Sequence, residues 1–249
     1  MFFSNFSSNP FMFILLAVLI IENLSAYISN PRALLGLILS IPGILIAITF
    51  HEYAHAWAAD KLGDDTPRRQ GRLNLNPLSH LDPMGVILLL FAGFGWGKPV
   101  EINSNNFNRK VSIKQGNAIV SIAGPAMNLL LALVFSIIYG LLLAFARTFV
   151  LTTTVGNVIL TIIEYTISMN IGLGIFNLIP LPPLDGSKVL LAFLPRKAQV
   201  WYENNSRLLY IIFVVIWITP IASIIISPAI RLVSTSLMKL VSAIAGISM

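Results

Sequence analysis

The chain contains long apolar segments of the kind that a lipid bilayer accommodates. A transmembrane helix needs about 20 mostly apolar residues, because the hydrocarbon layer is about 30 Å thick and each helical residue advances about 1.5 Å. The segments that meet this requirement are 11–29, 34–60, 115–146, 157–179 and 207–227. Hydrophobic residues make up 56% of the 249 residues and charged residues only 10%, which leaves too few polar residues for a sizeable soluble domain. The sequence therefore predicts an all-α, polytopic membrane protein.

The N-terminal segment is predicted to remain part of the mature chain. A cleaved signal peptide normally begins with basic residues, but the first Lys or Arg here is Arg32, and Glu22 interrupts the apolar stretch. We therefore expect a retained first span at 11–29. We also expect one integral membrane domain over residues 1–249, with its core at 34–194.

The tail after Pro228 combines an apolar helical face with a polar face that holds Arg231 and Lys239. This pattern is typical of a helix that lies in the membrane interface; the alternative is a short sixth span. We favour the interfacial helix for residues 228–249 and expect the C-terminal part, 207–249, to be peripheral to the core. The prediction is thus five to six transmembrane helices.

Basic residues are concentrated in two of the loops between the predicted spans. Cytoplasmic loops are enriched in Lys and Arg, so we expect both loops to face the cytoplasm. The same rule accounts for the net charge of +6, and we expect no nucleic-acid partner. The opposite side shows only Arg32 and Arg147 between spans. The basic residues of the two loops are Lys61, Arg68, Arg69, Arg72, Lys98, Arg109, Lys110 and Lys114 in the first, and Lys188, Arg196, Lys197 and Arg207 in the second.

The second predicted span carries the pentapeptide His51-Glu52-Tyr53-Ala54-His55 near its cytoplasmic end. Two histidines four residues apart lie on one face of a helix and can bind the same ion. In the HExxH pattern of zinc hydrolases, the glutamate acts as general base on a water that the metal activates. Ionisable groups inside a membrane are costly and usually functional, which weakens the alternative of two structural histidines. We therefore predict His51 and His55 as zinc ligands and Glu52 as the catalytic base.

A third protein ligand must come from His, Asp or Glu, because the chain has no cysteine. We favour Asp185, because three prolines at 180–183 end the fourth span at the depth predicted for the HExxH motif. An alternative role for Asp185 is to cap a helix at 187–194. The remaining histidine, His80, lies in a turn-rich segment of the first basic loop and is the other candidate.

Residues 84–102 predict a re-entrant, β-hairpin-like loop. The apolar run 86–91 is too short to span a bilayer, and the glycine-rich stretch 93–97 separates it from a second short run at 98–102. An exposed edge of such a loop would pair with an unwound substrate segment by strand addition. The alternative is an interfacial loop anchored by Trp96.

These motifs together resemble the site-2 protease family of intramembrane zinc metalloproteases. The resemblance is carried by the HExxH motif in one span, Gly124–Asn128 in the next and Asn177–Gly186 at the end of a later one, and it covers residues 34–194. The segment 71–85 is similar to that of the compact bacterial and archaeal branch. We expect the small residues of the second motif to allow close helix packing, with its asparagine bonding across helices.

The resemblance implies a complete active site. It implies that His51, His55 and Asp185 bind one zinc ion per chain and that Glu52 is the catalytic base. It also implies an active-site role for Asn177, which would hold the scissile carbonyl or its oxyanion.

The resemblance also implies an activity and a location. The activity is hydrolysis of a peptide bond in or near a transmembrane segment of a membrane-anchored protein, in regulated intramembrane proteolysis or in the clearance of signal-peptide remnants. The location is the prokaryotic cell membrane, and the basic loops predict that the active site lies near its cytoplasmic face. We expect no PDZ or CBS domain, because no stretch of the chain is long enough for one. The physiological substrate and the oligomeric state are left open.

Two other functions fit parts of the pattern. A membrane binding or assembly protein with a structural zinc site would normally use four protein ligands, so a site that includes His80 would favour this function. A metal transporter would place Glu22 and Glu164 along an ion path. We expect these two glutamates to be interfacial or packing residues and assign them no role.

Overall fold

The protein is helical throughout the part of the chain that the structure describes. The computed structural model covers residues 21, 24, 27–92 and 97–247. Within these residues one isolated β-bridge joins Leu81 to Gly97, and the predicted all-α class is confirmed. The helices are α3 (Pro31–Lys61), α4 (Thr66–Arg69), α5 (Pro77–His80), α6 (Pro83–Ala92), the 3₁₀ helix η1 (Ser104–Asn106), α7 (Ile113–Phe145), α8 (Arg147–Thr152), α9 (Thr154–Asn177), α10 (Asp185–Phe193), α11 (Arg196–Asn204), α12 (Ser206–Ile218) and α13 (Ile221–Ala245).

Four of these helices, α3, α7, α9 and α13, are long and apolar enough to cross a bilayer. The first three match the spans predicted at 34–60, 115–146 and 157–179, with ends that differ by at most three residues. The span predicted at 11–29 lies largely outside the described residues. The described helices are those of a multi-pass membrane protein.

Capping side chains and prolines set the ends of the long helices. The side-chain oxygen of Asn30 accepts hydrogen bonds from two N–H groups in the first turn of α3. Ser112 and Gln115 form a reciprocal capping box at the start of α7. Helix α9 ends at Asn177, shortly before the prolines at 180–183, which lack the N–H group needed to continue a helix. These local signals fix the lengths of the helices that carry the site.

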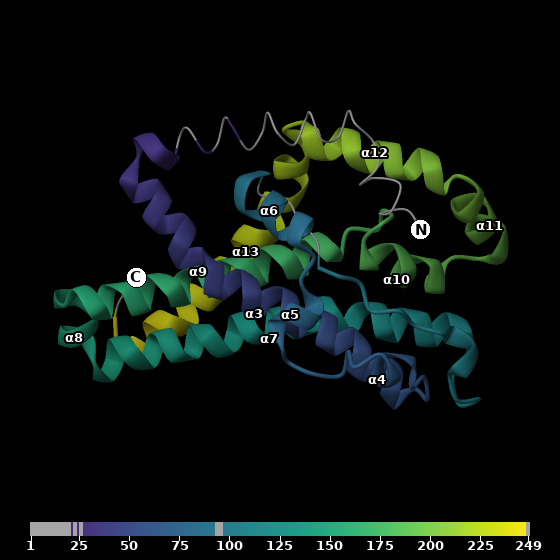
Figure 1. The fold of residues 1–249 in the computed structure, drawn as a ribbon, viewed down its shortest axis with the longest axis horizontal. Coiled ribbons are helices and arrows are strands. Elements are labelled where there is room, and N and C mark those ends of the chain that lie inside the picture. The colour runs from purple at the N-terminus through teal and green to yellow at the C-terminus, as the bar shows by residue number, and fades with distance from the viewer. Residues whose placement is uncertain (1–20, 22–23, 25–26, 93–96, 248–249) are drawn as a thin grey trace.

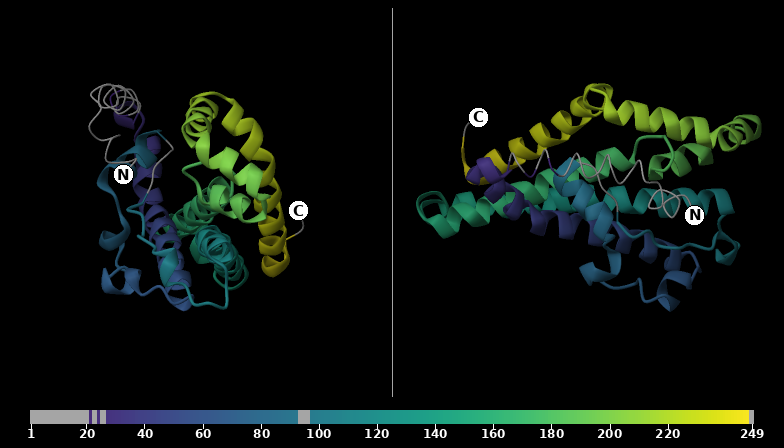
Figure 2. Two further views of the ribbon diagram at one scale, coloured as in Figure 1. Left: turned by 90° about the vertical axis from the view of Figure 1, so that its right-hand side faces the viewer. Right: turned by 45° about the horizontal axis from the view of Figure 1, so that its top comes forward.

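Helices α3, α7 and α9 pack against one another and form the centre of the bundle (Figure 1). Helix α13 packs against α7 and α9, and α10 packs against α7. The left view of Figure 2 shows α3 on one side of the molecule and α12 with α13 on the opposite side. A glycine allows a close approach of α3 to α9, because a Cβ atom at Gly43 would lie 2.9 Å from the Cα of Thr166.

The position predicted for the last span, 207–227, is wrong. The segment 207–227 is not one helix, because the chain becomes extended at Thr219 between α12 and α13. The residue before a proline is pushed out of the helical conformation, so the break falls at Pro220, whereas Pro228 lies inside α13. Helix α12 has 13 residues and is too short to cross a bilayer, whereas α13 has 25 residues and is long enough.

The tail predicted to lie in the membrane interface instead packs on the bundle as part of α13. Its apolar side chains contact a buried cluster contributed by α7 and α9. In lipid, such helix association depends on close van der Waals contact between side chains. The structure therefore favours the alternative of a further span, which begins at Ile221. The contacting residues are Ile230, Val233 and Leu237 of α13, and the cluster is Ala132, Ile163, Ile167 and Ile171.

The predicted re-entrant hairpin is not confirmed. Residues 86–91, predicted to be extended, belong to helix α6, which Pro83 begins. Proline is favoured at the first position of a helix, and a short apolar run fits a helix or a strand equally well by composition. Residues 93–96 lie outside the described part of the chain. After them, the N–H group of Lys98 donates to the carbonyl oxygen of His80 at 2.7 Å.

A buried carboxylate fastens the segment that follows Lys98 to the end of α3. Asp64 is fully buried and accepts hydrogen bonds from the backbone N–H of Asn103 at 2.7 Å and from the side-chain amide of Asn106 at 3.0 Å. It also accepts two from Thr66. Burial opposes ionisation of Asp64, but these hydrogen bonds outweigh burial and lower its pKa.

We expect Asp64→Ala to destabilise the protein by about 1–3 kcal/mol or more, because it leaves buried donors unpaired. Thermal unfolding in detergent, followed by circular dichroism, measures this loss. Because the folded pKa lies below the unfolded value of about 3.9, the stabilisation is complete above that value and is lost as the pH falls below it. The difference between wild type and variant should shrink in the same range.

The neighbouring Asp65→Ala is the matched control. Its carboxylate is half-exposed and pairs with Arg69 at the surface, so its loss should cost less than about 0.5 kcal/mol. Equal destabilisation by the two substitutions would contradict the role given to Asp64.

Candidate metal centre

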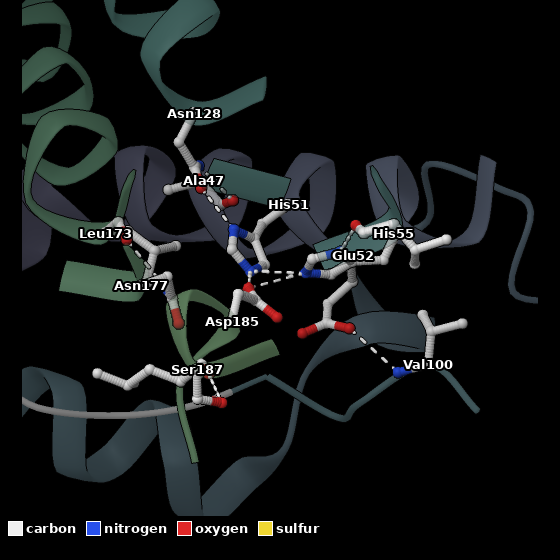
Figure 3. A network of polar contacts seen from close by, with 12 residues as sticks. Ala47, His51, Glu52, His55, Val100, Asn128, Leu173, Asn177, Asp185 and Ser187 are labelled. Carbon is white, nitrogen blue, oxygen red and sulfur yellow. Dashed lines mark hydrogen bonds and ion pairs between the residues drawn. The ribbon is translucent and has the colours of Figure 1, made fainter. Parts of the chain in front are cut away.

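His51 and His55 lie on one face of α3, one turn apart, as their spacing predicts. Both side chains are buried, and their Nε2 atoms are 3.0 Å apart (Figure 3). The two rings are nearly perpendicular, with an interplanar angle of 88°. Both imidazoles therefore direct one nitrogen to the same point.

Asp185 brings a third donor atom to this point from a distant part of the sequence. Its Oδ2 atom is 3.1 Å from Nε2 of His51 and 3.1 Å from Nε2 of His55. Asp185 is the first residue of α10, whose N-cap is Leu184, and its side chain makes no capping hydrogen bond. The alternative prediction that Asp185 caps the helix is therefore wrong, and its carboxylate faces the histidines.

The three donor atoms fit a tetrahedral zinc ion. Bonds of about 2.0–2.2 Å from zinc to nitrogen or oxygen separate tetrahedral ligand atoms by roughly 3.3–3.6 Å. The observed separations of 3.0–3.1 Å are only slightly shorter. Among the described residues, His51, His55 and Asp185 form a group that can hold a metal ion, with all ligand atoms within 4.8 Å of one another.

Asn128 fixes the orientation of the His51 ring. Its side-chain oxygen accepts a hydrogen bond from Nδ1 of His51 at 2.6 Å, which leaves Nε2 of that ring without a proton and able to bind a metal. The amide group of Asn128 donates to the carbonyl of Ala47 and to the side chain of Asn170, both at 2.9 Å. The bond across helices predicted for Asn128 is confirmed, and it also holds the ring in place.

A backbone carbonyl orients the second imidazole. Nδ1 of His55 donates to the carbonyl oxygen of Val120 at 2.7 Å, which again leaves Nε2 for a metal. Helix α7 approaches the two rings closely at Gly124, where a Cβ atom would lie 2.5 Å from Nε2 of His55 and 2.7 Å from Cε1 of His51. The close packing predicted for the motif at 124–128 thus occurs directly against the metal centre.

Glu52 lies beside the three donor atoms without being one of them. Its Oε2 atom accepts a hydrogen bond from the backbone N–H of Val100 at 3.1 Å (Figure 3). A Cβ atom at Gly97 would lie 3.1 Å from Oε1, so the absence of a side chain there keeps space next to the second oxygen. The segment after α6 therefore positions one oxygen of Glu52 and leaves the other accessible.

A cavity of about 170 Å³ contains the metal centre and Glu52. Asn177, at the end of α9, also lines this cavity, together with Lys188. The side-chain amide of Asn177 donates one hydrogen bond to the carbonyl of Leu173 at 3.0 Å. An amide group has two N–H donors, and this hydrogen bond uses one of them.

His80 is not part of the metal group. It is fully buried, and its Nε2 donates to the carbonyl oxygen of Asn74 at 2.7 Å. Burial lowers the pKa of His80 and so favours the neutral ring. The alternative of His80 as third ligand is therefore wrong. Its side chain bonds to the carbonyl of Asn74, and its own carbonyl accepts the hydrogen bond from Lys98.

Sequence reasoning missed three groups of the site. Asn170 is fully buried and bonded to Asn128, and its only signal was a polar amide inside a predicted span. The carbonyl of Val120 and the N–H of Val100 are backbone groups, which every residue type offers, so no sequence signal marks them.

A helix with the HExxH motif, completed by a carboxylate from another helix inside an apolar bundle, defines a membrane metalloprotein of the zinc hydrolase type. The model of Peptidase family M50 matches residues 39–219 of the chain. The protein named "Putative zinc metalloprotease YwhC" from Bacillus subtilis is 37% identical over 201 residues, which cover 81% of this chain and 90% of that protein. The protein named "Putative zinc metalloprotease Rip2" from Mycolicibacterium smegmatis is 30% identical over 223 residues, which cover 85% and 81%. No solved structure matches the chain.

The chain therefore belongs to peptidase family M50, and the predicted resemblance to the site-2 proteases is confirmed. The names of its relatives and the group of two histidines and an aspartate agree on zinc as the metal.

We expect Asn128→Ala to lower zinc affinity by about 10- to 100-fold, because the His51 ring loses the partner that fixes its orientation. Competition with a chromogenic chelator measures the affinity directly, without any assay of catalysis. Ser136→Ala is the matched control, because Ser136 is also buried on α7 but donates only to Ala132 of its own helix. Equal zinc affinity in the two variants would show that Asn128 does not support the site.

Proposed function

We propose that the protein is an intramembrane zinc metalloendopeptidase, which hydrolyses a peptide bond in or near a transmembrane segment of a membrane-anchored protein. The observation that carries the proposal is the position of Glu52. Its carboxylate lies in the same cavity as the donors His51, His55 and Asp185, inside a bundle of apolar helices.

Glu52 is proposed as the general base and acid. When bound, zinc polarises the scissile carbonyl and makes water a better nucleophile. The hydrogen bond from Val100 holds Oε2, so Oε1 is the atom that takes the proton from the attacking water. The same carboxyl group then delivers this proton to the nitrogen of the leaving amine. One water is consumed, and a carboxyl and an amine end are formed.

Asn177 is proposed to donate a hydrogen bond to the carbonyl oxygen of the scissile peptide. Asn177 lines the cavity that holds Glu52, and an amide N–H directed at that oxygen would stabilise the charge that develops on it. Its bond to Leu173 in the last turn of α9 restricts the side chain, so little reorganisation is needed during the reaction.

The substrate is proposed to be cut near the cytoplasmic face. The HExxH motif lies in the last third of α3, the helix end that leads into the first basic loop. A helical substrate hides its carbonyl groups in hydrogen bonds, so it must unwind locally before the attack. Regulated intramembrane proteolysis and the removal of signal-peptide remnants both require such a cut.

The two alternative functions receive less support. A structural zinc site is normally closed by four protein ligands, but the described group has three, and His80 is engaged elsewhere. A transporter would use Glu164 as part of an ion path, but this carboxylate accepts a hydrogen bond from Tyr139 at 2.5 Å. The metal group beside a carboxylate that is not one of its donors fits hydrolysis better than either function.

We expect Glu52→Gln to reduce peptide cleavage by about 10²- to 10⁴-fold, because the amide cannot take up a proton. The probes are single-pass reporter proteins whose transmembrane segments carry a helix-weakening Asn-Pro pair near the cytoplasmic end. Purified protein and reporter are combined in liposomes, and mass spectrometry identifies the cleaved bond. Zinc content should remain that of the wild type, because Glu52 is not a ligand.

Glu164→Gln is the matched control and should cleave at the wild-type rate, because this carboxylate lies outside the site. Removal of zinc with a chelator should abolish cleavage, and added zinc should restore it. Cleavage by Glu52→Gln at the wild-type rate would refute the role of Glu52.

A further inference from the structure

A larger, apolar cavity lies beside the metal centre. It has a volume of about 500 Å³ and is lined by residues of α3, α6, α9, α12 and α13 around the helix break at Thr219. None of its lining residues is Asp, Glu, Lys, Arg or His. The hydroxyl groups of Thr219 and Ser223 donate to backbone carbonyls of the neighbouring helical turns. The cavity is therefore suited to apolar groups.

The two cavities adjoin each other along α3 and α9. Ile44 of the apolar cavity and His51 of the metal centre are seven residues apart on α3, or about 10 Å. The apolar cavity lies on the side of the metal centre away from Lys61 and thus towards the predicted middle of the bilayer. Four residues line both cavities: Ile48, Leu89, Leu173 and Phe176.

We propose that this cavity binds the substrate residues on the membrane side of the scissile bond. It selects substrates that have bulky aliphatic or aromatic side chains there. The inference rests on the proposed proteolytic function. A chain whose peptide bond lies at Glu52 and which continues towards the middle of the bilayer passes Ile48 and enters the apolar cavity.

The size of the cavity limits what it holds. One turn of α-helix with its side chains is about 10–12 Å across and 5.4 Å high, or roughly 400–600 Å³. The cavity of about 500 Å³ therefore accommodates about one turn, or a few residues of extended chain, but not a whole transmembrane helix. Selectivity should act on the few residues closest to the cut.

Gly172 of α9 gives the cavity its depth. A Cβ atom at this position would meet no atom within 4 Å, whereas one at Gly174 would meet the carbonyl oxygen of Pro125 at 3.2 Å. A larger side chain at 172 therefore fills the cavity without displacing a helix. One turn further along α9, Phe176 lines both cavities and contacts the Trp217 ring edge to face, at 4.8 Å between centroids.

The test uses the full-length protein in liposomes and three reporter proteins. The reporters differ in about one turn of residues on the membrane side of the cleaved bond, which is all Ala in one reporter, all Leu in another and all Phe in the third. Wild type should cleave the Leu and Phe reporters with a kcat/KM at least about tenfold above the Ala reporter. Gly172→Leu should lower kcat/KM for the bulky reporters about tenfold and leave the Ala reporter within about twofold, and Gly172→Ala should have a smaller effect.

Val155→Leu is the control and should change none of these values. Val155 is 62% exposed and lies about 25 Å from Gly172 along the same helix. Zinc content and the unfolding temperature of Gly172→Leu should equal those of the wild type. An equal slowing of all three reporters by Gly172→Leu, or no change in any, would overturn the proposal.

A binding measurement tests the cavity proposal independently of the proposed proteolytic function. Fluorescence anisotropy measures the affinity of each reporter for the Glu52→Gln protein, with and without Gly172→Leu. Loss of the size preference in Gly172→Leu supports the cavity even if wild type cleaves no reporter, and in that case only the proteolytic function fails. Cleavage without any size preference supports proteolysis and overturns the cavity proposal. Equal reporter affinities, with a co-purifying lipid displaced by Gly172→Leu, assign the cavity to a lipid chain and also overturn it.

Discussion

The side chain of Asn128 connects the stability of the bundle to the chemistry of its metal centre. A polar group inside an apolar bundle is costly unless every donor and acceptor has a partner. Asn128 accepts a hydrogen bond from His51 and donates to Ala47 and Asn170, so it joins α3, α7 and α9. The hydrogen bond to His51 also sets the orientation of this ring, whose Nε2 atom faces Asp185 and His55. The hydrogen bonds that hold the central helices together therefore also orient the His51 ring of the candidate metal site.

The long helices of the centre were predictable because length and hydropathy alone determine them. Helices α3, α7 and α9 follow apolar runs with clear caps at their ends. The C-terminal helices were not predictable in this way, because their apolar run contains two prolines and either of them could end a helix. Pro220 ends α12, while Pro228 is accommodated inside α13. The short run at 86–91 was also wrongly assigned, since its composition fits a helix as well as a strand.

The sequence predicted His51, His55 and Asp185 as the residues that could hold a metal, and the structure brings these three together; the groups that support them were not predicted. His51 and His55 follow from a four-residue spacing, and Asp185 follows from the prolines that end α9. The groups that orient them include the carbonyl of Val120, and the N–H of Val100 positions Glu52. Such backbone groups depend on how distant segments meet, which a single sequence does not encode locally. The catalytic roles of Glu52 and Asn177 remain predictions for the proposed experiments.

The distance along the chain between the residues of the candidate metal group has a consequence for biosynthesis. His51 and Asp185 are 134 positions apart, with α7 and α9 inserted between them. A nascent chain that has delivered only α3 to the membrane holds two imidazoles and lacks the third ligand. The complete donor set forms only after α10 has emerged and docked on α7. The order of translation thus delays assembly of the three-donor group until the helices that carry its supporting groups, α7 and α9, have been made.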